Sequence, residues 1–125
     1  MIGVAFKGDE ESIKSDYHVY QWDTGQKLMV AGIDNLSINE VHFTAKGLKV
    51  AYVTEVESTG GTFTVDIPNN VLTYGTDITA YICFRTETGN VMTIKTVVIP
   101  VIKRSKPENY DSEFIRALED LVEVT

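Results

Sequence analysis

The pattern of hydrophobic and polar residues is dominated by two long runs that flank a short turn. Residues 77–86 alternate between apolar and more polar side chains, which is typical of a strand with one buried face. Residues 91–102 are rich in β-branched side chains, which suit a pleated sheet. Because the four residues 87–90 between the runs include a glycine, the pattern predicts a β-hairpin at the centre of an all-β domain.

Shorter runs of the same kind precede this hairpin. A glycine-containing turn at 24–26 favours a second hairpin, and residues 69–75 suit either one turn of helix or a loop that crosses between sheets. Residues 1–6 form either an edge strand or an arm that docks on a neighbour. Pro100 marks an edge or a bulge, because proline cannot donate a hydrogen bond to a ladder. The other predicted strands are 17–23, 27–31, 40–45, 48–57 and 62–68.

The spacing of strands and turns predicts the architecture. About seven or eight strands, with a turn roughly every ten residues, favour one antiparallel β-sandwich. The only tryptophan is interpreted as a core anchor, with a surface aromatic that stacks on sugar as the alternative. The residues predicted to form the core are Trp22, Val41, Phe43, Phe63, Val65, Ile67, Ile78, Ile82 and Phe84.

The hydrophobic period changes near the C-terminal end of the chain. After a basic linker at 103–107, apolar residues recur at steps of three and four, which predicts a short amphipathic α-helix from Ser112 to Val124. The sequence is therefore divided into a β-sandwich domain (1–104) and a linker with a helix (105–125). A helix this short is marginal alone in water, so its apolar side must pack on the sandwich or on another subunit. The residues predicted to form this oligomer or partner interface are Phe114, Ile115, Leu118, Leu121 and Val122.

Composition narrows the classes of function. Eighteen acidic and eleven basic residues give a net charge of −7, which disfavours nucleic-acid binding. Residues 108–125 hold six acids and one base, a net charge of −5. A single cysteine allows no intrachain disulfide, which argues against a small disulfide-stapled secreted domain. No signal-peptide core and no apolar run of about 20 residues is visible, so no membrane partner is expected.

The sequence shows no pattern typical of catalysis or metal binding. It lacks a phosphate-binding glycine-rich loop, a Cys-x-x-Cys pair and a nucleophile elbow. His18 and His42 fall on separate predicted strands and are interpreted as surface residues, and Cys83 as a small packing residue. We therefore expect a protein that is not an enzyme and that holds no cofactor and no metal.

Four segments, in this order, resemble a known group of proteins. The segments 19–32, 40–47, 65–82 and 97–110 are similar to small phage and prophage structural proteins of Gram-positive hosts. The likeness is to the N-terminal domain of upper baseplate or fibre-anchoring proteins. This resemblance implies an immunoglobulin-like β-sandwich that attaches to a virion. In longer relatives a stalk or fibre follows the sandwich, whereas here one short helix follows it.

The expected function follows from this resemblance. It is that of a virion structural protein, an oligomeric adaptor, decoration or fibre-base module on the tail baseplate or the head. Its expected partners are other copies of itself, with a trimer as one form, and other virion proteins. It would be made in the cytoplasm of the host bacterium and reside in the virion. The alternatives are a carbohydrate-binding β-sandwich module and an enzyme subunit; an adaptor needs the C-terminal helix, whereas a monomeric sugar binder does not.

Overall fold

The computed structural model describes residues 1–33 and 38–110. This part of the chain is all β apart from one helical turn, α1 (Asn69–Leu72). The largest sheet has the strand order β2 (Ser12–Lys14), β9 (Val91–Ile99), β8 (Ile78–Arg85), β5 (Glu40–Ala45) and β6 (Tyr52–Glu55). A second sheet consists of β1 (Ile2–Ala5), β4 (Lys27–Ala31) and β7 (Phe63–Asp66). The strands β10 (Val101–Ile102) and β3 (Val19–Tyr20) pair separately.

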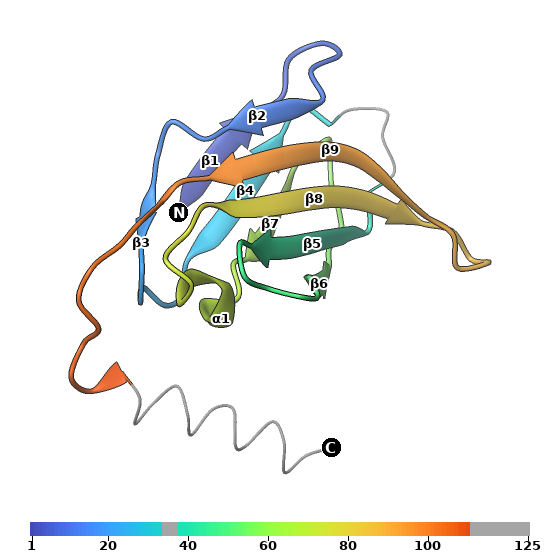
Figure 1. Cartoon of the computed structure of the whole chain (residues 1–125). Helices are drawn as coiled ribbons and strands as arrows, with labels where there is room; N and C mark the ends of the chain where they lie inside the picture. The colour runs from blue at the N-terminus through green and yellow to red at the C-terminus, as the bar shows by residue number, and fades with distance from the viewer. Residues whose placement is uncertain (34–37, 111–125) are drawn as a thin grey trace.

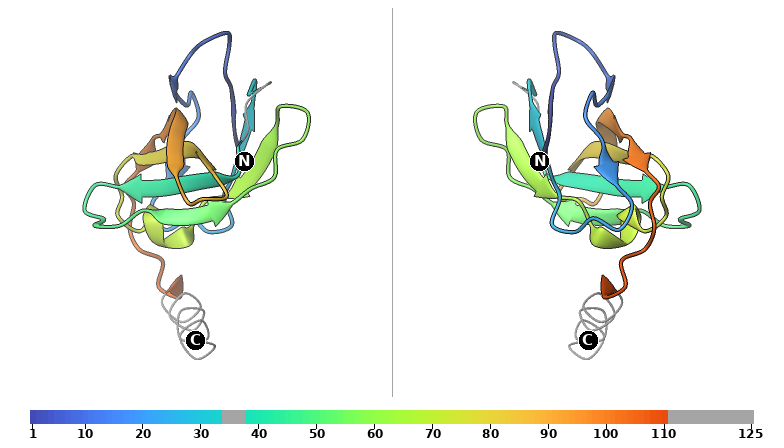
Figure 2. Two further views of the ribbon diagram at one scale, coloured as in Figure 1. Left: turned by 90° about the vertical axis from the view of Figure 1, so that its right-hand side faces the viewer. Right: turned by 90° about the vertical axis from the view of Figure 1, so that its left-hand side faces the viewer.

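The two larger sheets form two layers with the core between them. Figure 1 shows β1, β4 and β7 behind the strands β9, β8 and β5, and Figure 2 shows the same layers from two sides. Both sheets alternate buried and exposed residues along most of their strands, which is typical of sheets with one face on a core. The largest fully buried side chains come from both layers and from α1, and include Leu28, Phe43, Ile67, Leu72, Ile78, Ile82 and Ile99.

Most of the predicted strands are confirmed. The strands β8 and β9 form the predicted central hairpin, and β5 covers the predicted residues 40–45. The segment 69–75 contains one helical turn, and β1 lies at an edge of its sheet. Pro100 separates β9 from β10, so it marks the point where the chain leaves the large sheet for a new partner.

The predicted hairpin of residues 17–23 and 27–31 is wrong. The strand β3 pairs with β10, and β4 lies between β1 and β7. The reason is that the residues after Pro100 run beside β3: the Val19 amide donates to the Pro100 carbonyl at 3.1 Å. The strand β3 therefore pairs with β10, near the other end of the chain, and not with the adjacent residues 27–31.

The expected purely antiparallel arrangement also needs correction. The pairs β1–β4, β2–β9 and β3–β10 are parallel, and ten strands occur in the described residues instead of seven or eight. The sequence pattern did not predict β2, because its three residues lie in a charged stretch with little apolar content. The strand β6 covers 52–55 instead of 48–57 and is largely exposed at the edge of its sheet.

Seven of the nine predicted core residues are buried, whereas Phe84 and Trp22 are only partly buried. Phe84 lies opposite Met92, which is 55% exposed, at the end of the hairpin that extends beyond the second layer. Trp22 lies outside the two layers, in the turn that follows β3.

The predicted helix 112–124 and its interface residues lie outside the described residues. In the described ranges 1–33 and 38–110, no helix is long and apolar enough to cross a membrane.

Candidate functional site

The chain leaves the two layers through residues 103–110, which we call the exit segment. It follows β10 and extends away from both sheets (Figure 1, orange). Lys103, Arg104 and Lys106 are exposed, whereas Tyr110 is buried, with 7% of its surface accessible. The exit segment directly precedes the predicted amphipathic helix 112–124. The contacts that hold the exit segment therefore influence the direction in which the following residues leave the domain.

A four-residue turn after β3 contacts the exit segment. The Asp23 amide donates to the Tyr20 carbonyl at 3.1 Å, and the Tyr20 amide donates to Asp23 Oδ2 at 3.0 Å. At the third position of this turn Trp22 has a φ of 73°, the only positive φ of a non-glycine residue among the described residues. Glycine or asparagine is favoured where a turn needs a positive φ at this position.

The Trp22 side chain holds the exit segment. Its Nε1 donates to the Arg104 carbonyl at 3.1 Å. The ring of Tyr110 meets the indole edge-on with 5.2 Å between centroids, and Lys106 Nζ lies 5.4 Å from the indole centroid. Trp22 therefore makes its contacts with the exit segment and does not occupy the predicted core position.

Gln21 connects the same turn to two further segments. Its backbone amide donates to the Ile102 carbonyl at 2.8 Å, which continues the β3–β10 pairing. Its side-chain Oε1 accepts a hydrogen bond from the Arg104 amide at 3.3 Å, and its Nε2 donates to the Thr73 carbonyl at 3.0 Å. Thr73 is the C-cap residue of α1, so one side chain joins the exit segment to the end of the helical turn.

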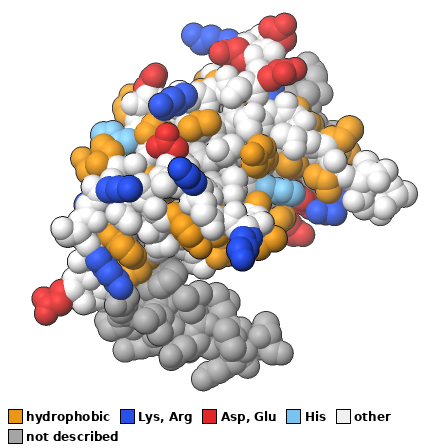
Figure 3. Space-filling model, viewed as in Figure 1, with side chains coloured by type: hydrophobic (Ala, Val, Ile, Leu, Met, Phe, Trp, Pro, Cys, Tyr) orange, Lys and Arg blue, Asp and Glu red, His pale blue; other side chains and the backbone are white. Residues whose placement is uncertain are grey.

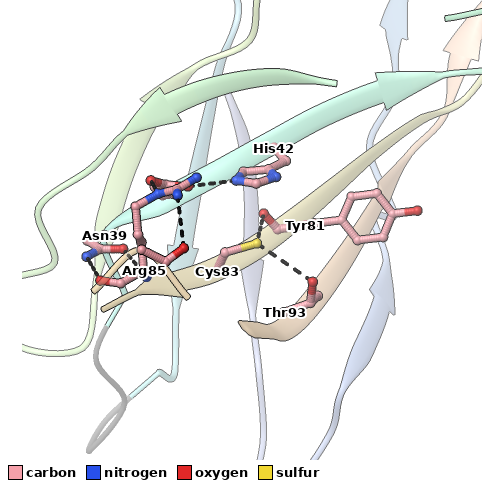
Figure 4. A network of polar contacts seen from close by, with 8 residues as sticks. Asn39, His42, Tyr81, Cys83, Arg85 and Thr93 are labelled. Carbon is pink, nitrogen blue, oxygen red and sulfur yellow. Dashed lines mark hydrogen bonds and ion pairs between the residues drawn. The ribbon is translucent and has the colours of Figure 1, made fainter. Parts of the chain in front are cut away.

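The exposed face of the large sheet carries a polar cluster, shown in Figure 4. The Glu40 carboxylate accepts hydrogen bonds from Arg85 through both Nε and Nη2, and its Oε1 lies 2.8 Å from His42 Nε2. Asn39 fixes the Arg85 backbone, because its Oδ1 accepts from the Arg85 amide at 2.8 Å and its Nδ2 donates to the Arg85 carbonyl at 3.0 Å. Glu40 is therefore a buried acid on the outward side of its strand, held by groups from its own strand and from β8.

The electrostatics of this cluster favour a structural role. Hydrogen bonds from Arg85 and then His42 hold the pKa of Glu40 below its usual value, and Glu40 in turn raises the pKa of Arg85. Burial raises the pKa of the neighbouring Cys83, whose Sγ lies 3.4 Å from the Tyr81 carbonyl and 3.8 Å from Thr93 Oγ1. A thiol with a raised pKa is a poor nucleophile at neutral pH, and a carboxylate bound by two partners is a poor base.

The burial of Glu40 was not predicted from the sequence. The alternation in β5 marks Val41, Phe43 and Ala45 as core residues and gives no signal for Glu40. The signal lies in the pairing register, which places Glu40 opposite Cys83 and two positions from Arg85 along β8. In the part of the chain that the structure describes, no group of three or more His, Cys, Asp or Glu side chains is placed to hold a metal ion.

The surface around this cluster is mixed in character. Val53 on β6, Tyr81 on β8 and Val91 on β9 are between 37% and 54% exposed. In Figure 3, which shows this side of the molecule, hydrophobic side chains are interspersed with Lys and Arg and with Asp and Glu. Such a face does not have the single-sign charge that nucleic-acid binding requires.

The exit segment is therefore the part of the described structure most directly related to the predicted interface. The predicted partner residues Phe114, Ile115, Leu118, Leu121 and Val122 lie beyond the described residues, so the structure does not place them. It places the segment that precedes them and shows which side chains hold it.

Comparisons with known proteins give little beyond this geometry. No known protein-family model matches the chain, and no curated protein matches it. Among solved structures, the N-terminal domain of phage TP901-1 ORF48 matches with a TM-score of 0.46 and 16% sequence identity. That match covers 83% of this chain and 96% of the other. A likeness at this level assigns neither a fold family nor a function.

Proposed function

We propose that the protein is a virion structural protein of a phage, in which a small β domain carries a C-terminal segment that joins it to other subunits. The observation that supports this most directly is the exit segment, which leaves both layers and is held at its base by Gln21 and Trp22. The ordered sequence segments that resemble baseplate and fibre-anchoring proteins support the same proposal.

The sequence beyond the exit segment supports a role in assembly. The apolar residues at 114–122 recur with helical spacing, and a helix of this length needs a partner surface in water. Residues 108–125 carry a net charge of −5, whereas Lys103, Arg104 and Lys106 before them are basic and exposed. Opposite charges on adjacent parts of one chain allow neighbouring copies to pack with the acidic side of one against the basic linker of another.

The proposal also covers the type of β-sandwich and the role of the domain in the virion. Two sheets packed face to face agree with an immunoglobulin-like sandwich, in a version where β1 and β2 pair in parallel with their neighbours. In this proposal the domain acts as an oligomeric adaptor, decoration or fibre base on the tail or the head. Self-association occurs through Phe114, Ile115, Leu118, Leu121 and Val122.

The experiment compares the full chain with a chain that ends at Lys106. Light scattering gives the mass of each, and thermal unfolding shows whether the domain remains folded. We expect an oligomer for the full chain and a folded monomer for the shortened one. A double variant with Leu118→Asp and Leu121→Asp should behave as the shortened chain, and Arg116→Gln serves as its matched control. Equal masses together with a loss of stability on shortening would mean that the helix belongs to its own domain.

If the full chain is monomeric in isolation, binding to purified virions decides between the remaining possibilities. Co-sedimentation of the full chain but not of the double variant with virions that lack the protein would support the adaptor role. Binding of the isolated protein to host cell-wall glycan without binding to virions would instead favour the carbohydrate-binding alternative.

A further inference from the structure

We propose that Gln21 and Trp22 form a clamp that fixes the direction in which the C-terminal segment leaves the domain. The clamp consists of the side chains of Gln21 and Trp22 together with their contacts to Arg104, Lys106 and Tyr110. It is a conformational property of the chain itself, so it does not depend on the proposed role in a virion.

The first observation is the conflict between residue type and backbone at Trp22. A positive φ crowds the Cβ of an L-residue, and for a bulky side chain such a conformation is a genuine outlier. Strained residues persist where the surrounding structure determines them, and they gather at functional positions. A glycine would satisfy this turn without strain, so the reason for a tryptophan must be sought in its side chain.

The side chain supplies that reason. The indole contacts lie beyond the turn and span more than 80 residues of sequence, since Nε1 of Trp22 binds the carbonyl of Arg104. The other two contacts of the indole, with Lys106 and Tyr110, also belong to the exit segment. Trp22 lies outside the buried core cluster, so its contacts orient the exit segment and contribute little to holding the two layers together.

Gln21 gives the clamp a second point of attachment, on α1. The amide and carbonyl of one residue, Arg104, are both bound, the amide by Gln21 and the carbonyl by Trp22. Gln21 also binds the Thr73 carbonyl, and its side chain fits against Gly75, where a Cβ would come within 2.8 Å of it. The exit segment is thus tied at one residue to both the β3 turn and the end of α1, which restricts rotation about either attachment.

Limited proteolysis of the full chain with trypsin tests the clamp. The bonds after Lys103 and Arg104 lie in the exit segment, and the bond after Lys46 lies in the turn after β5 and serves as an internal standard. Mass spectrometry gives the rate of each cleavage. The variants are Trp22→Gly, which relieves the strained turn and removes the indole, and Trp22→Phe, which keeps a ring and removes the hydrogen-bond donor. Tyr20→Ala is the matched control, because that side chain is exposed in the same turn.

We expect Trp22→Gly to accelerate cleavage after Lys103 and Arg104 about tenfold, since a hydrogen bond and an aromatic contact are lost. Trp22→Phe should give a smaller acceleration, and Tyr20→Ala none, with the Lys46 bond unchanged in all three. The proposal is wrong if Trp22→Gly leaves the exit bonds unchanged. It is also wrong if, in either Trp22 variant, cleavage after Lys46 accelerates as much as cleavage after Lys103 and Arg104. Trp22 would then stabilise the whole domain and not the exit segment in particular.

Discussion

Ile82 on β8 lies opposite Lys95 on β9, whereas the next residue of β8, Cys83, lies opposite Thr93. Ile94 is therefore an extra residue, and β9 contains a bulge at this point. The bulge keeps Lys95 on the side of the core and brings Thr93 beside the Cys83 thiol on the outward side. A single irregularity thus places a charged residue inside the domain and a hydroxyl next to a buried cysteine.

The position of Phe84 beyond this bulge lowers the expected cost of its removal. A fully buried phenylalanine typically costs about 3–5 kcal/mol when it is replaced by alanine. Phe84 is only partly buried, so Phe84→Ala should reduce the free energy of unfolding by about 1–2 kcal/mol. The matched control is Phe43→Ala, at a fully buried position in β5, which should give the full effect of about 3–5 kcal/mol. Urea unfolding of both variants checks the difference, and equal losses would contradict the position assigned to Phe84.

Lys95 is expected to hold the connection between β1 and β2. Its ammonium donates to the Glu10 carbonyl and lies 4.9 Å from the centre of the Phe6 ring. Lys95→Met keeps the length of the side chain and removes the charge, so the loop should open more often. The Thr96 amide, which donates to the Glu11 carbonyl at 2.9 Å, should then exchange with deuterium about tenfold faster.

Lys14→Met is the control for this measurement, because Lys14 is exposed on β2 of the same region. It should leave the exchange of the Thr96 amide unchanged. An unaltered exchange rate in Lys95→Met would mean that the loop is held by its backbone hydrogen bonds alone.

Glu40 should make stability depend on pH in the acidic range. Arg85, and after it His42, lowers the pKa of Glu40 in the folded state below the ordinary value of 4.5. The ionised carboxylate therefore stabilises the fold above that value, and this contribution disappears as the pH falls through the lowered pKa. Glu40→Gln should reduce the free energy of unfolding at pH 7 by about 1 kcal/mol, a modest figure because Arg85 is partly open to solvent.

The measurement is urea unfolding of the wild type and of Glu40→Gln at a series of pH values. The difference between them should be present at neutral pH and should shrink as the pH falls below 4.5 and through the lowered pKa of Glu40. Glu11→Gln, at an exposed position just before β2 and at the other edge of the sheet, provides the control. A difference that persists unchanged at the lowest pH would exclude the ionised pair as its cause.

The sequence pattern predicted several local elements correctly, although the same kind of signal wrongly predicted the hairpin of 17–23 and 27–31. The strand β5 and the hairpin β8–β9 were predicted, because alternation and a glycine-containing turn are encoded within a few residues. The pairing of β3 with β10 was not predictable in this way, because it depends on contacts between residues about 80 positions apart. The burial of Glu40 was missed for the same reason, since its partner Arg85 lies 45 residues away.

Trp22 shows a different limit of sequence reasoning. Its hydrophobic character suggested the core, and nothing local indicates a positive φ at a tryptophan. Its real partners belong to the exit segment, which the sequence presented only as a charged linker. The predicted interface residues, Phe114 to Val122, lie outside the described part of the chain, so that interpretation stays a prediction.

Dialysis against a chelator is expected to leave the protein unchanged. The prediction rests on the lack of a ligand pattern in the sequence and on the surroundings of the two histidines, of which His42 binds Glu40 and His18 stacks edge-on with Tyr20. The melting temperature before and after treatment with EDTA should agree. A fall of many degrees that zinc or calcium restores would reveal a structural metal site.

Gly75 should resist substitution because of its positive φ, and an added side chain would also push against the end of Gln21. Its φ is +65°, and an added Cβ would lie 2.8 Å from the Gln21 side chain. Gly75→Ala therefore combines the cost of a positive φ, about 1–2 kcal/mol, with a collision that displaces Gln21 from Thr73 and Arg104. Gly8→Ala is the matched control, because Gly8 has a φ of +57° with nothing within 4 Å of an added Cβ.

Urea unfolding should show a larger loss of stability for Gly75→Ala than for Gly8→Ala. The double variant Gly75→Ala with Gln21→Ala separates the two causes, because it removes the side chain that collides. If the collision matters, adding Gln21→Ala to Gly75→Ala should cost less than Gln21→Ala costs in the wild type, a coupling of about 0.5–2 kcal/mol. Additive effects would show that Gln21 moves aside freely, and they would leave only the backbone conformation to explain the glycine.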